Sequence, residues 1–229
     1  MKMQNVTAFL ETLERLCTVA SDEKIAEGQA AYMRHQFRFY GIKTPERREI
    51  QRDLFQKSLL PSKNDLPALV RVLWEKKERE NQYIGQELAR KYVRLQEEND
   101  VLLFEYMITH KSWWDTVDFI AVNLVGSYFR SFPEKREAIT EKWMSSGNIW
   151  LQRTTLLFQL KYKGDLDTEF LGKTITQLLG SREFFINKAI GWVLREYSKT
   201  DPSWVRRFAA ATPLDPLSAR EALRLLKDR

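Results

Sequence analysis

An all-α fold is predicted by three features of the sequence. Apolar residues recur at the three- and four-residue spacing of a helix along almost the whole chain. Gly and Pro are sparse, with 9 and 7 among 229 residues. Alternating polar and apolar segments joined by turn dipeptides, which are typical of β-hairpins, do not occur. The sequence therefore predicts helices joined by short connections, without a low-complexity linker.

The first 95 residues are predicted to hold five helices, over 4–20, 22–36, 45–58, 65–77 and 79–95. The third begins in GIKTPERR (41–48), where Thr44 can cap the helix and Pro45 suits its first turn. Arg47 and Arg48 follow, and we expect them to face solvent or to touch phosphate. The run EKKERE (75–80) is typical of an exposed turn of mixed charge.

Eight further helices are predicted, over 99–110, 113–130, 134–145, 149–162, 166–179, 184–198, 202–210 and 216–227. Phe132-Pro133 and Gly180-Ser181 act as stop signals between them. Ser112 followed by Asp115 has the pattern of a capping box at the start of the 113–130 helix. The core stripe of that helix is predicted to be Val117, Ile120, Ala121, Leu124, Val125 and Tyr128.

The helices repeat at an interval near 35 residues. Aligning 148–163 with 183–199 without gaps pairs Arg153 with Lys188 and Tyr162 with Tyr197. Tyr92 lies two such intervals before Tyr162. A period of this length with two helices per unit is typical of an α-solenoid of HEAT-like repeats. We expect a single domain over 1–229, with residues 1–60 as a cap and repeats over about 61–229.

Composition and charge exclude several function classes. Lys and Arg outnumber Asp and Glu by 37 to 31, and the pI near 9.3 slightly favours a polyanionic partner. The single Cys17 and the two histidines make a disulfide framework or a Cys/His zinc site close to impossible. Without a bilayer-spanning stretch or a signal-peptide pattern, a cytoplasmic protein with no membrane partner is expected. Phosphate-binding glycine loops and a G-x-S-x-G elbow are absent, which argues against nucleotide hydrolases and esterases.

Three successive repeats place a tryptophan beside charged residues on the second helix. The groups are Trp114 with Asp118, Trp150 with Arg153, and Trp192 with Lys188 and Arg195. Their members lie three or four residues apart and so share a helix face. A single Trp is ordinarily a core residue and a single Asp an ion-paired one. Three groups in register favour a shared functional groove.

The residue types of this groove suggest chemistry on a nucleic acid. Arg153, Lys188 and Arg195 can neutralise phosphates along a backbone. Indole faces attract cations and stack against sugars or bases. Asp118 repels phosphate, so a surface that only binds DNA gains nothing from it. A lone carboxylate among cations and aromatic rings suits the stabilisation of a positive centre, such as the oxocarbenium-like sugar formed when a glycosidic bond breaks.

Six segments extend this pattern from about residue 30 to 200. They are YMRHQF (32–37), GIKTPERR (41–48), KSWWDTVD (111–118), NIWLQR (148–153), FQLKYK (158–163) and KAIGWVLREY (188–197). Together they resemble the HEAT-like-repeat DNA alkylation repair family of alkylpurine DNA glycosylases. The resemblance implies a right-handed α-solenoid with a concave, basic DNA-binding groove. It also implies a bacterial-type, monomeric enzyme that acts at the nucleoid.

The activity implied by the resemblance is that of a monofunctional DNA glycosylase. Such an enzyme excises cationic N3-methyladenine and N7-methylguanine from duplex DNA without metal, cofactor or lyase step, and without flipping the base into a pocket. By position, Asp118 is then the catalytic carboxylate, and Trp114 and Trp192 are aromatic walls around the lesion. Tyr32 lines the same cleft. The further candidate DNA-binding residues are Arg153, Lys188, Arg195, Lys111, Arg47 and Arg48.

Two other functions stay open at this point. One is a non-catalytic relative that binds bent or branched DNA with the same basic groove, and Asp118 with Trp114 and Trp192 argues against it. The other is a HEAT-like scaffold for a protein partner, which predicts no salt-dependent affinity for DNA. The residue pattern also leaves open which cationic lesion is preferred. Whether Asp118 acts as a base or as an electrostatic stabiliser is equally open.

Overall fold

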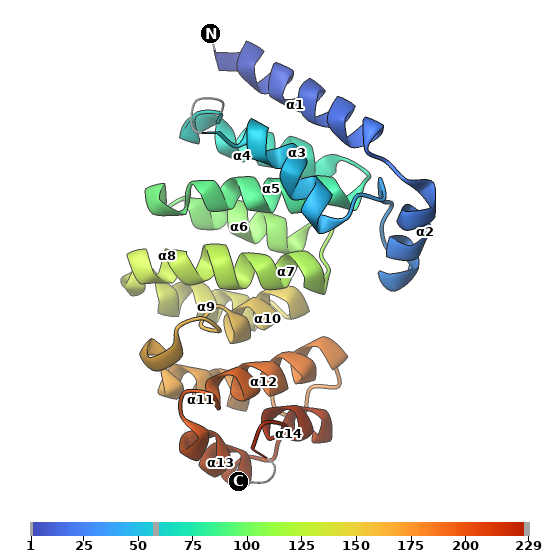
Figure 1. Ribbon diagram of the computed structural model, residues 1–229. Helices are drawn as coiled ribbons and strands as arrows, with labels where there is room; N and C mark the ends of the chain where they lie inside the picture. The colour runs from blue at the N-terminus through green and yellow to red at the C-terminus, as the bar shows by residue number, and fades with distance from the viewer. Residues whose placement is uncertain (1, 57–59, 227–229) are drawn as a thin grey trace. The chain divides into compact units, whose positions relative to one another are not determined.

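The computed structural model describes residues 2–56 and 60–226, whose regular structure is helical apart from one isolated bridge between Arg38 and Glu78 (Figure 1). The predicted all-α class is therefore confirmed. No helix in this part of the chain is both long enough and apolar enough to cross a bilayer. The chain divides into two compact units, Met1–Leu95 and Gln96–Arg229, here called unit 1 and unit 2. The single repeat domain with residues 1–60 as a cap stays a prediction.

The described residues of unit 1 form five α-helices. They are α1 (Lys2–Val19), α2 (Glu23–Tyr32), α3 (Thr44–Leu54), α4 (Leu66–Glu75) and α5 (Arg79–Lys91). Helices α4 and α5 pack against each other. Their packing follows from apolar residues at helical spacing, since Leu69, Leu73 and Trp74 of α4 and Ile84 and Leu88 of α5 are buried.

The turn between α4 and α5 corrects one prediction. The sequence predicts an exposed turn of mixed charge over 75–80, but the side chains of Arg79 and Glu80 are fully buried. The carboxylate of Glu80 accepts the backbone N–H groups of residues 40–42 at distances of 3.0–3.1 Å. Its partners lie almost 40 residues away in the chain. The local charge pattern therefore could not show that this acid is satisfied in the interior.

Every predicted helix has a counterpart among the described residues, and the differences lie at the helix ends. Thr44 is the first residue of α3 rather than its cap, and the backbone N–H of Lys43 donates to the Glu46 carboxylate at 3.2 Å. The predicted ends at residues 58 and 227 fall outside the described residues.

Unit 2 holds the candidate groove residues from 111 onward. Its helices are α6 (Asp100–Thr109), α7 (Trp114–Ile120), α8 (Gly126–Ser131), α9 (Arg136–Ser145), α10 (Ile149–Leu157), α11 (Thr168–Gln177), α12 (Phe184–Tyr197), α13 (Pro202–Ala211) and α14 (Pro216–Ala222). Residues of α10, α11 and α12 form an apolar core of unit 2, to which Val205 and Ala222 of the last two helices add.

The helix predicted over 113–130 is continuous but not uniform. Five residues between α7 and α8, Ala121–Val125, form a π-helical turn, a rare feature that is frequent near functional sites. The six residues of the predicted core stripe are all buried, which confirms that prediction. The predicted capping box is wrong, because the helix is capped by Trp113 and the hydroxyl of Ser112 donates to the Ile108 carbonyl at 2.6 Å.

Tyrosines that recur along the chain make equivalent hydrogen bonds in both units. Tyr92, Tyr128 and Tyr162 each donate a hydroxyl hydrogen bond to a backbone carbonyl 31, 30 and 36 residues earlier. Each bond ties the end of one helix pair to the chain that precedes the pair. The tyrosines that suggest a 35-residue period in the sequence therefore have a common structural role.

Candidate active site

Asp118 and Arg153 form a buried ion pair between α7 and α10. Arg153 Nε donates to Asp118 Oδ1 at 2.7 Å, and Nη2 donates to Oδ2 at 2.9 Å. The side chains of Arg153 and Asp118 are 4% and 14% exposed. This parallel, two-bond geometry is the strongest that an arginine and a carboxylate can form. The sequence predicts that the two residues share one groove, and the structure brings them into direct contact.

The third nitrogen of the Arg153 guanidinium connects this pair to α12. Arg153 Nη1 donates to the backbone carbonyl of Phe185, so all three guanidinium nitrogens have acceptors. The sequence predicts that Arg153 contacts a DNA phosphate, but here it is buried and holds Asp118. Residues 118, 153 and 185 thus join α7, α10 and α12.

Burial dominates the protonation behaviour of Asp118. Removal of the carboxylate from water raises its pKa above the ordinary value, because the charged form loses hydration. The hydrogen bonds and positive charge of Arg153 act in the opposite direction but do not cancel the effect. Perturbed carboxyl groups with a specific charged partner are enriched at functional sites.

Three aromatic rings pack beside the ion pair. The ring centroids of Trp113 and Trp150 lie 5.8 Å apart, and those of Phe185 lie 5.1 and 5.0 Å from them. Arg153 lies 5.9 Å from the centroid of the Phe185 ring. Trp150 therefore belongs to an aromatic cluster whose Phe185 ring faces the Arg153 guanidinium. Sequence reasoning did not assign a role to Trp113, which directly precedes α7.

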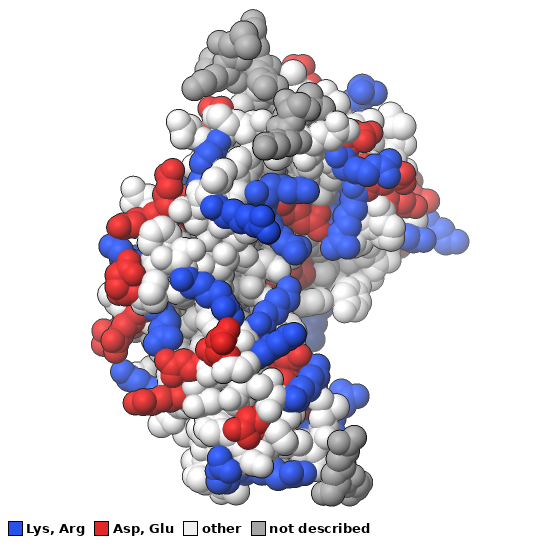
Figure 2. Space-filling model, turned by 60° about the vertical axis from the view of Figure 1, so that its left-hand side comes forward, with Lys and Arg blue, Asp and Glu red and all other residues white. Residues whose placement is uncertain are grey.

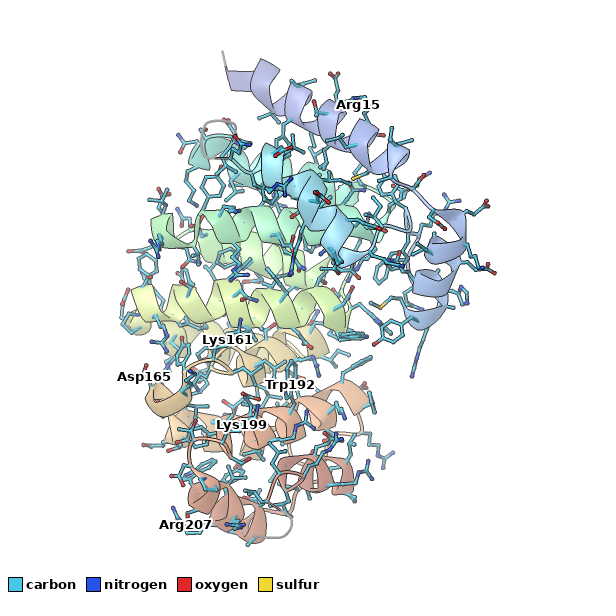
Figure 3. The ribbon with its side chains drawn as sticks, viewed as in Figure 1. Arg15, Lys161, Asp165, Trp192, Lys199 and Arg207 are labelled. Carbon is cyan, nitrogen blue, oxygen red and sulfur yellow. The ribbon has the colours of Figure 1, made fainter. Side chains whose placement is uncertain are left out.

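Trp114 and Trp192 are both half-buried. Trp114 begins α7 one helical turn before Asp118, so the two side chains share a face. Trp192 lies on α12 and packs in part against the core of unit 2 (Figure 3). Each indole therefore combines anchorage in the protein with surface that remains accessible to a ligand.

The two cations that flank Trp192 on α12 share one buried acid. Lys188 Nζ lies 2.9 Å from Glu221 Oε1, and Arg195 Nη1 pairs with Glu221 Oε2. Lys188 and Arg195 remain 37% and 22% exposed, so both can be reached from solvent. Sequence reasoning missed Glu221, because nothing in the 216–222 segment distinguishes it from an ordinary surface acid.

Comparison with known proteins shows which family the chain belongs to. The model of the family described as DNA alkylation repair enzyme matches residues 13–226. The chain belongs to the DNA alkylation repair enzyme family. A solved structure described as a predicted DNA alkylation repair enzyme from Enterococcus faecalis is 34% identical, with a TM-score of 0.85. The match covers 91% of this chain and 98% of that one. No curated protein matches the chain. Membership supports a role for this protein as an enzyme of DNA repair.

The remaining candidate residues of this DNA alkylation repair enzyme differ in accessibility. Lys111 precedes α7, is half-buried and has a positive φ of 48°. In unit 1, Tyr32 is 72% exposed at the end of α2. Arg47 is buried, pairs with Glu87 at 3.3 Å and is not the solvent-facing arginine that the sequence predicts. Arg48 is 64% exposed and lies 3.4 Å from the same acid.

Basic and acidic side chains are mixed on the surface of this family member. In the lower half of Figure 2, basic side chains lie close together with acidic ones between them. The exposed arginines of the last two helices include Arg206, Arg207 and Arg220, and Arg224, also exposed, follows α14. Within 2–56 and 60–226, no group of three or more His, Cys, Asp or Glu side chains is placed to hold a metal ion.

Proposed function

We propose that this repair enzyme is a monofunctional DNA glycosylase that hydrolyses the N-glycosidic bond of cationic alkylpurines, N3-methyladenine and N7-methylguanine among them. The observation that carries the proposal is the Asp118 carboxylate, buried and held in one orientation by Arg153 beside Trp114. A fixed anion in a water-poor site stabilises a developing cation without reorganisation during the reaction. Asp118 is the catalytic residue in this proposal, and Arg153 positions it.

The leaving group explains why one carboxylate suffices. An N3- or N7-alkylated purine already carries a positive charge, so it needs no proton from an acid in order to leave. The C1′–N bond breaks, its electron pair neutralises the purine, and positive charge develops on the sugar. Water then forms a bond to C1′ and gives up a proton, either to Asp118 or to solvent. The products are the free neutral base and an abasic site in an intact strand.

Arg153 leaves Asp118 competent for this role. Two carboxylate oxygens offer about four acceptor positions, and Arg153 occupies two of them. The remaining positions can accept a hydrogen bond from the attacking water or face the sugar. In this proposal the pair survives substrate binding, and other cations hold the DNA backbone.

Trp114 and Trp192 are proposed to contact the DNA around the lesion. Indole faces attract cations, and the reaction has two of them, the alkylated base before cleavage and the sugar at the transition state. Both indoles are held by the protein and still accessible. In this proposal the base is not flipped into a pocket, and selectivity comes from the charge of the lesion.

DNA-backbone contacts are proposed for Lys188, Arg195, Lys111, Arg48 and Tyr32, which are all at least partly accessible. A lyase step would need a lysine that attacks C1′ as a free amine. Lys188 lies beside Trp192 but is engaged with Glu221. The proposed enzyme therefore leaves the DNA strand uncut. We further propose that it needs no metal or cofactor and acts as a monomer in the cytoplasm.

The decisive experiment is single-turnover release of 7-methylguanine from a methylated duplex in the presence of EDTA. We expect Asp118→Asn to lower the rate by roughly 10²-fold or more, the size typical of losing one electrostatic catalytic group. Asp165→Asn removes an exposed carboxylate of the same unit and serves as the matched control, with an unchanged rate. Strands should remain uncut until heated in alkali.

Three outcomes would contradict this proposal. If the wild type releases no base but binds duplex DNA in a salt-sensitive way, the protein is a non-catalytic DNA binder. If Asp118→Asn retains full activity while Asp165→Asn also does, catalysis lies elsewhere. Absence of both release and DNA binding would favour the protein scaffold.

A further inference from the structure

Glu221 is a buried anion between the two cations that flank Trp192. Its side chain is 10% exposed, and its two oxygens contact Lys188 and Arg195 separately. Lys188, Trp192 and Arg195 lie at i, i+4 and i+7 of α12, so the three side chains follow one face of the helix. The cations best placed to bind DNA beside Trp192 therefore already share an internal counter-ion.

The position of Glu221 is fixed by close packing of α14 on α12. Gly191 makes the approach feasible, because a Cβ atom there would lie only 2.6 Å from the Cβ of Glu221 and 2.9 Å from the Ser218 carbonyl oxygen. The Ser218 hydroxyl donates to the Asn187 carbonyl at 2.8 Å, which ties the two helices together at the same level. Glu221 is thus held in place by the packing of α14 on α12.

The carboxylate stays charged over the whole physiological range. Its hydrogen bond with Lys188, followed by the nearby positive charges, holds the pKa of Glu221 below the usual value. Arg224, one turn further along the chain beyond α14, adds to the surrounding positive charge. One acid therefore faces three cations, and the cluster keeps a net positive charge.

We infer that Glu221 competes with DNA phosphates for Lys188 and Arg195 and thereby keeps the affinity for undamaged duplex low. A phosphate that approaches these cations must share them with a carboxylate that is already bound. Counter-ion release from the pair is smaller than for two unpaired cations, because the protein supplies part of the neutralising charge. A low affinity for undamaged duplex suits a repair enzyme, because it allows the enzyme to dissociate quickly from sites without a lesion. The inference rests on the proposed DNA-binding role of α12.

The test is equilibrium binding of a fluorescently labelled, undamaged duplex over a series of salt concentrations. Glu221→Gln keeps the size of the side chain and removes its charge. We expect it to tighten binding by about three- to tenfold and to steepen the slope of log K against log salt by about 0.9, the value for one additional cation. Glu141→Gln, an exposed acid of α9, makes the same change in net charge and should give a smaller shift.

A double-mutant comparison separates competition from a structural effect. Lys188→Gln should weaken binding more in the Glu221→Gln background than in the wild type, where Lys188 is already partly neutralised. Unchanged or weakened binding by Glu221→Gln, or an effect equal to that of Glu141→Gln, would overturn the inference. Because undamaged DNA is used, failure of the glycosylase activity leaves this test intact. A duplex that fails to bind the wild type at any salt concentration would refute both the inference and the DNA-binding role beneath it.

Discussion

The proposed catalytic residue Asp118 lies at a position where burial opposes ionisation of its carboxyl group. An exposed carboxyl would be ionised at every physiological pH, but it would also be solvated and free to rotate. Burial removes the competing water, and Arg153 supplies the two hydrogen bonds that make an ionised carboxylate tolerable there. The raised pKa is a consequence of this arrangement and can be measured.

The pH dependence of base release should report the titration of Asp118. The proposed reaction needs the ionised carboxylate, so the single-turnover rate is expected to fall as the pH drops through the raised pKa of Asp118. The acid limb should therefore lie above the ordinary value of 3.8. Rates measured from neutral to acidic pH on a pre-methylated duplex test this. An acid limb at or below 3.8 would contradict it, after unfolding at low pH has been excluded by circular dichroism.

Arg153 should affect both the stability of the protein and the position of that acid limb. Arg153→Met leaves Asp118 buried without a partner, so we expect a loss of about 3–5 kcal/mol in the free energy of unfolding. The same change removes the interactions that lower the pKa of Asp118, and the acid limb should move to higher pH. Urea unfolding and the pH profile measure the two effects.

An exposed ion pair in the same unit provides the control for Arg153. Lys173 lies 3.8 Å from Glu137, and both side chains are largely exposed. Lys173→Met should change stability by about 1 kcal/mol or less and leave the pH profile in place. Equal effects of Arg153→Met and Lys173→Met would argue against a positioning role for Arg153. The same conclusion would follow if Arg153→Met weakened DNA binding but left the pKa of Asp118 unchanged.

At the scale of elements, buried hydrogen bonds hold a connection between helices in place. Glu80, at the start of α5, accepts the backbone N–H groups of residues 40–42, and Gly41 among them adopts a φ of +87°. A side chain at Gly41 would collide with the Asp22 carbonyl oxygen, 1.9 Å from the ideal Cβ position. The loop before α3 is thus specified jointly by a glycine and by an acid almost 40 residues away.

Loss of the Glu80 carboxylate should destabilise unit 1. Glu80→Ala leaves buried N–H groups without acceptors, each costing about 1–3 kcal/mol, so the total loss should exceed a single such contribution. Glu80→Gln keeps one acceptor oxygen and should lose less. Urea unfolding gives the free energies, and hydrogen exchange at residues 40–42 locates the effect. Wild-type exchange rates in Glu80→Ala would show that other groups hold the loop.

At the scale of the whole molecule, the net charge is only +6. Binding of a polyanion therefore depends on where the basic side chains lie and on which of them are paired with acids. Several basic residues of unit 2 are neutralised by acids, as Lys188 and Arg195 are by Glu221. Accessible cations, and not the net charge, should therefore decide the strength of DNA binding.

The affinity of the wild-type protein for duplex DNA should fall steeply with salt. If on the order of four cations replace counter-ions, the slope of log K against log salt should be about −3.6. Fluorescence anisotropy at several salt concentrations gives the slope. A protein-binding scaffold predicts no such dependence, so a slope near zero would remove the DNA-binding role altogether.

Much of the architecture follows from local sequence patterns. Each predicted helix is present, and the stripe from Val117 to Tyr128 is buried as its spacing predicts. The 35-residue recurrence of tyrosine corresponds to hydrogen bonds that tie successive repeats. The motifs around Asp118 and Trp192 also indicate the family from the sequence alone. Periodicity and motifs are readable because they depend on residues that are near one another in the chain.

The partners of the charged residues depend on the tertiary structure alone. Arg153 is 35 residues from Asp118, Glu221 is 26 residues from Arg195, and Glu80 is about 40 residues from the loop that it holds. Local sequence patterns predict a solvent-facing or phosphate-binding role for some of these residues and give no signal for the others. A charge is stable in the interior only when an opposite charge or hydrogen-bond donor reaches it. Only the packing of distant helices brings that partner within reach.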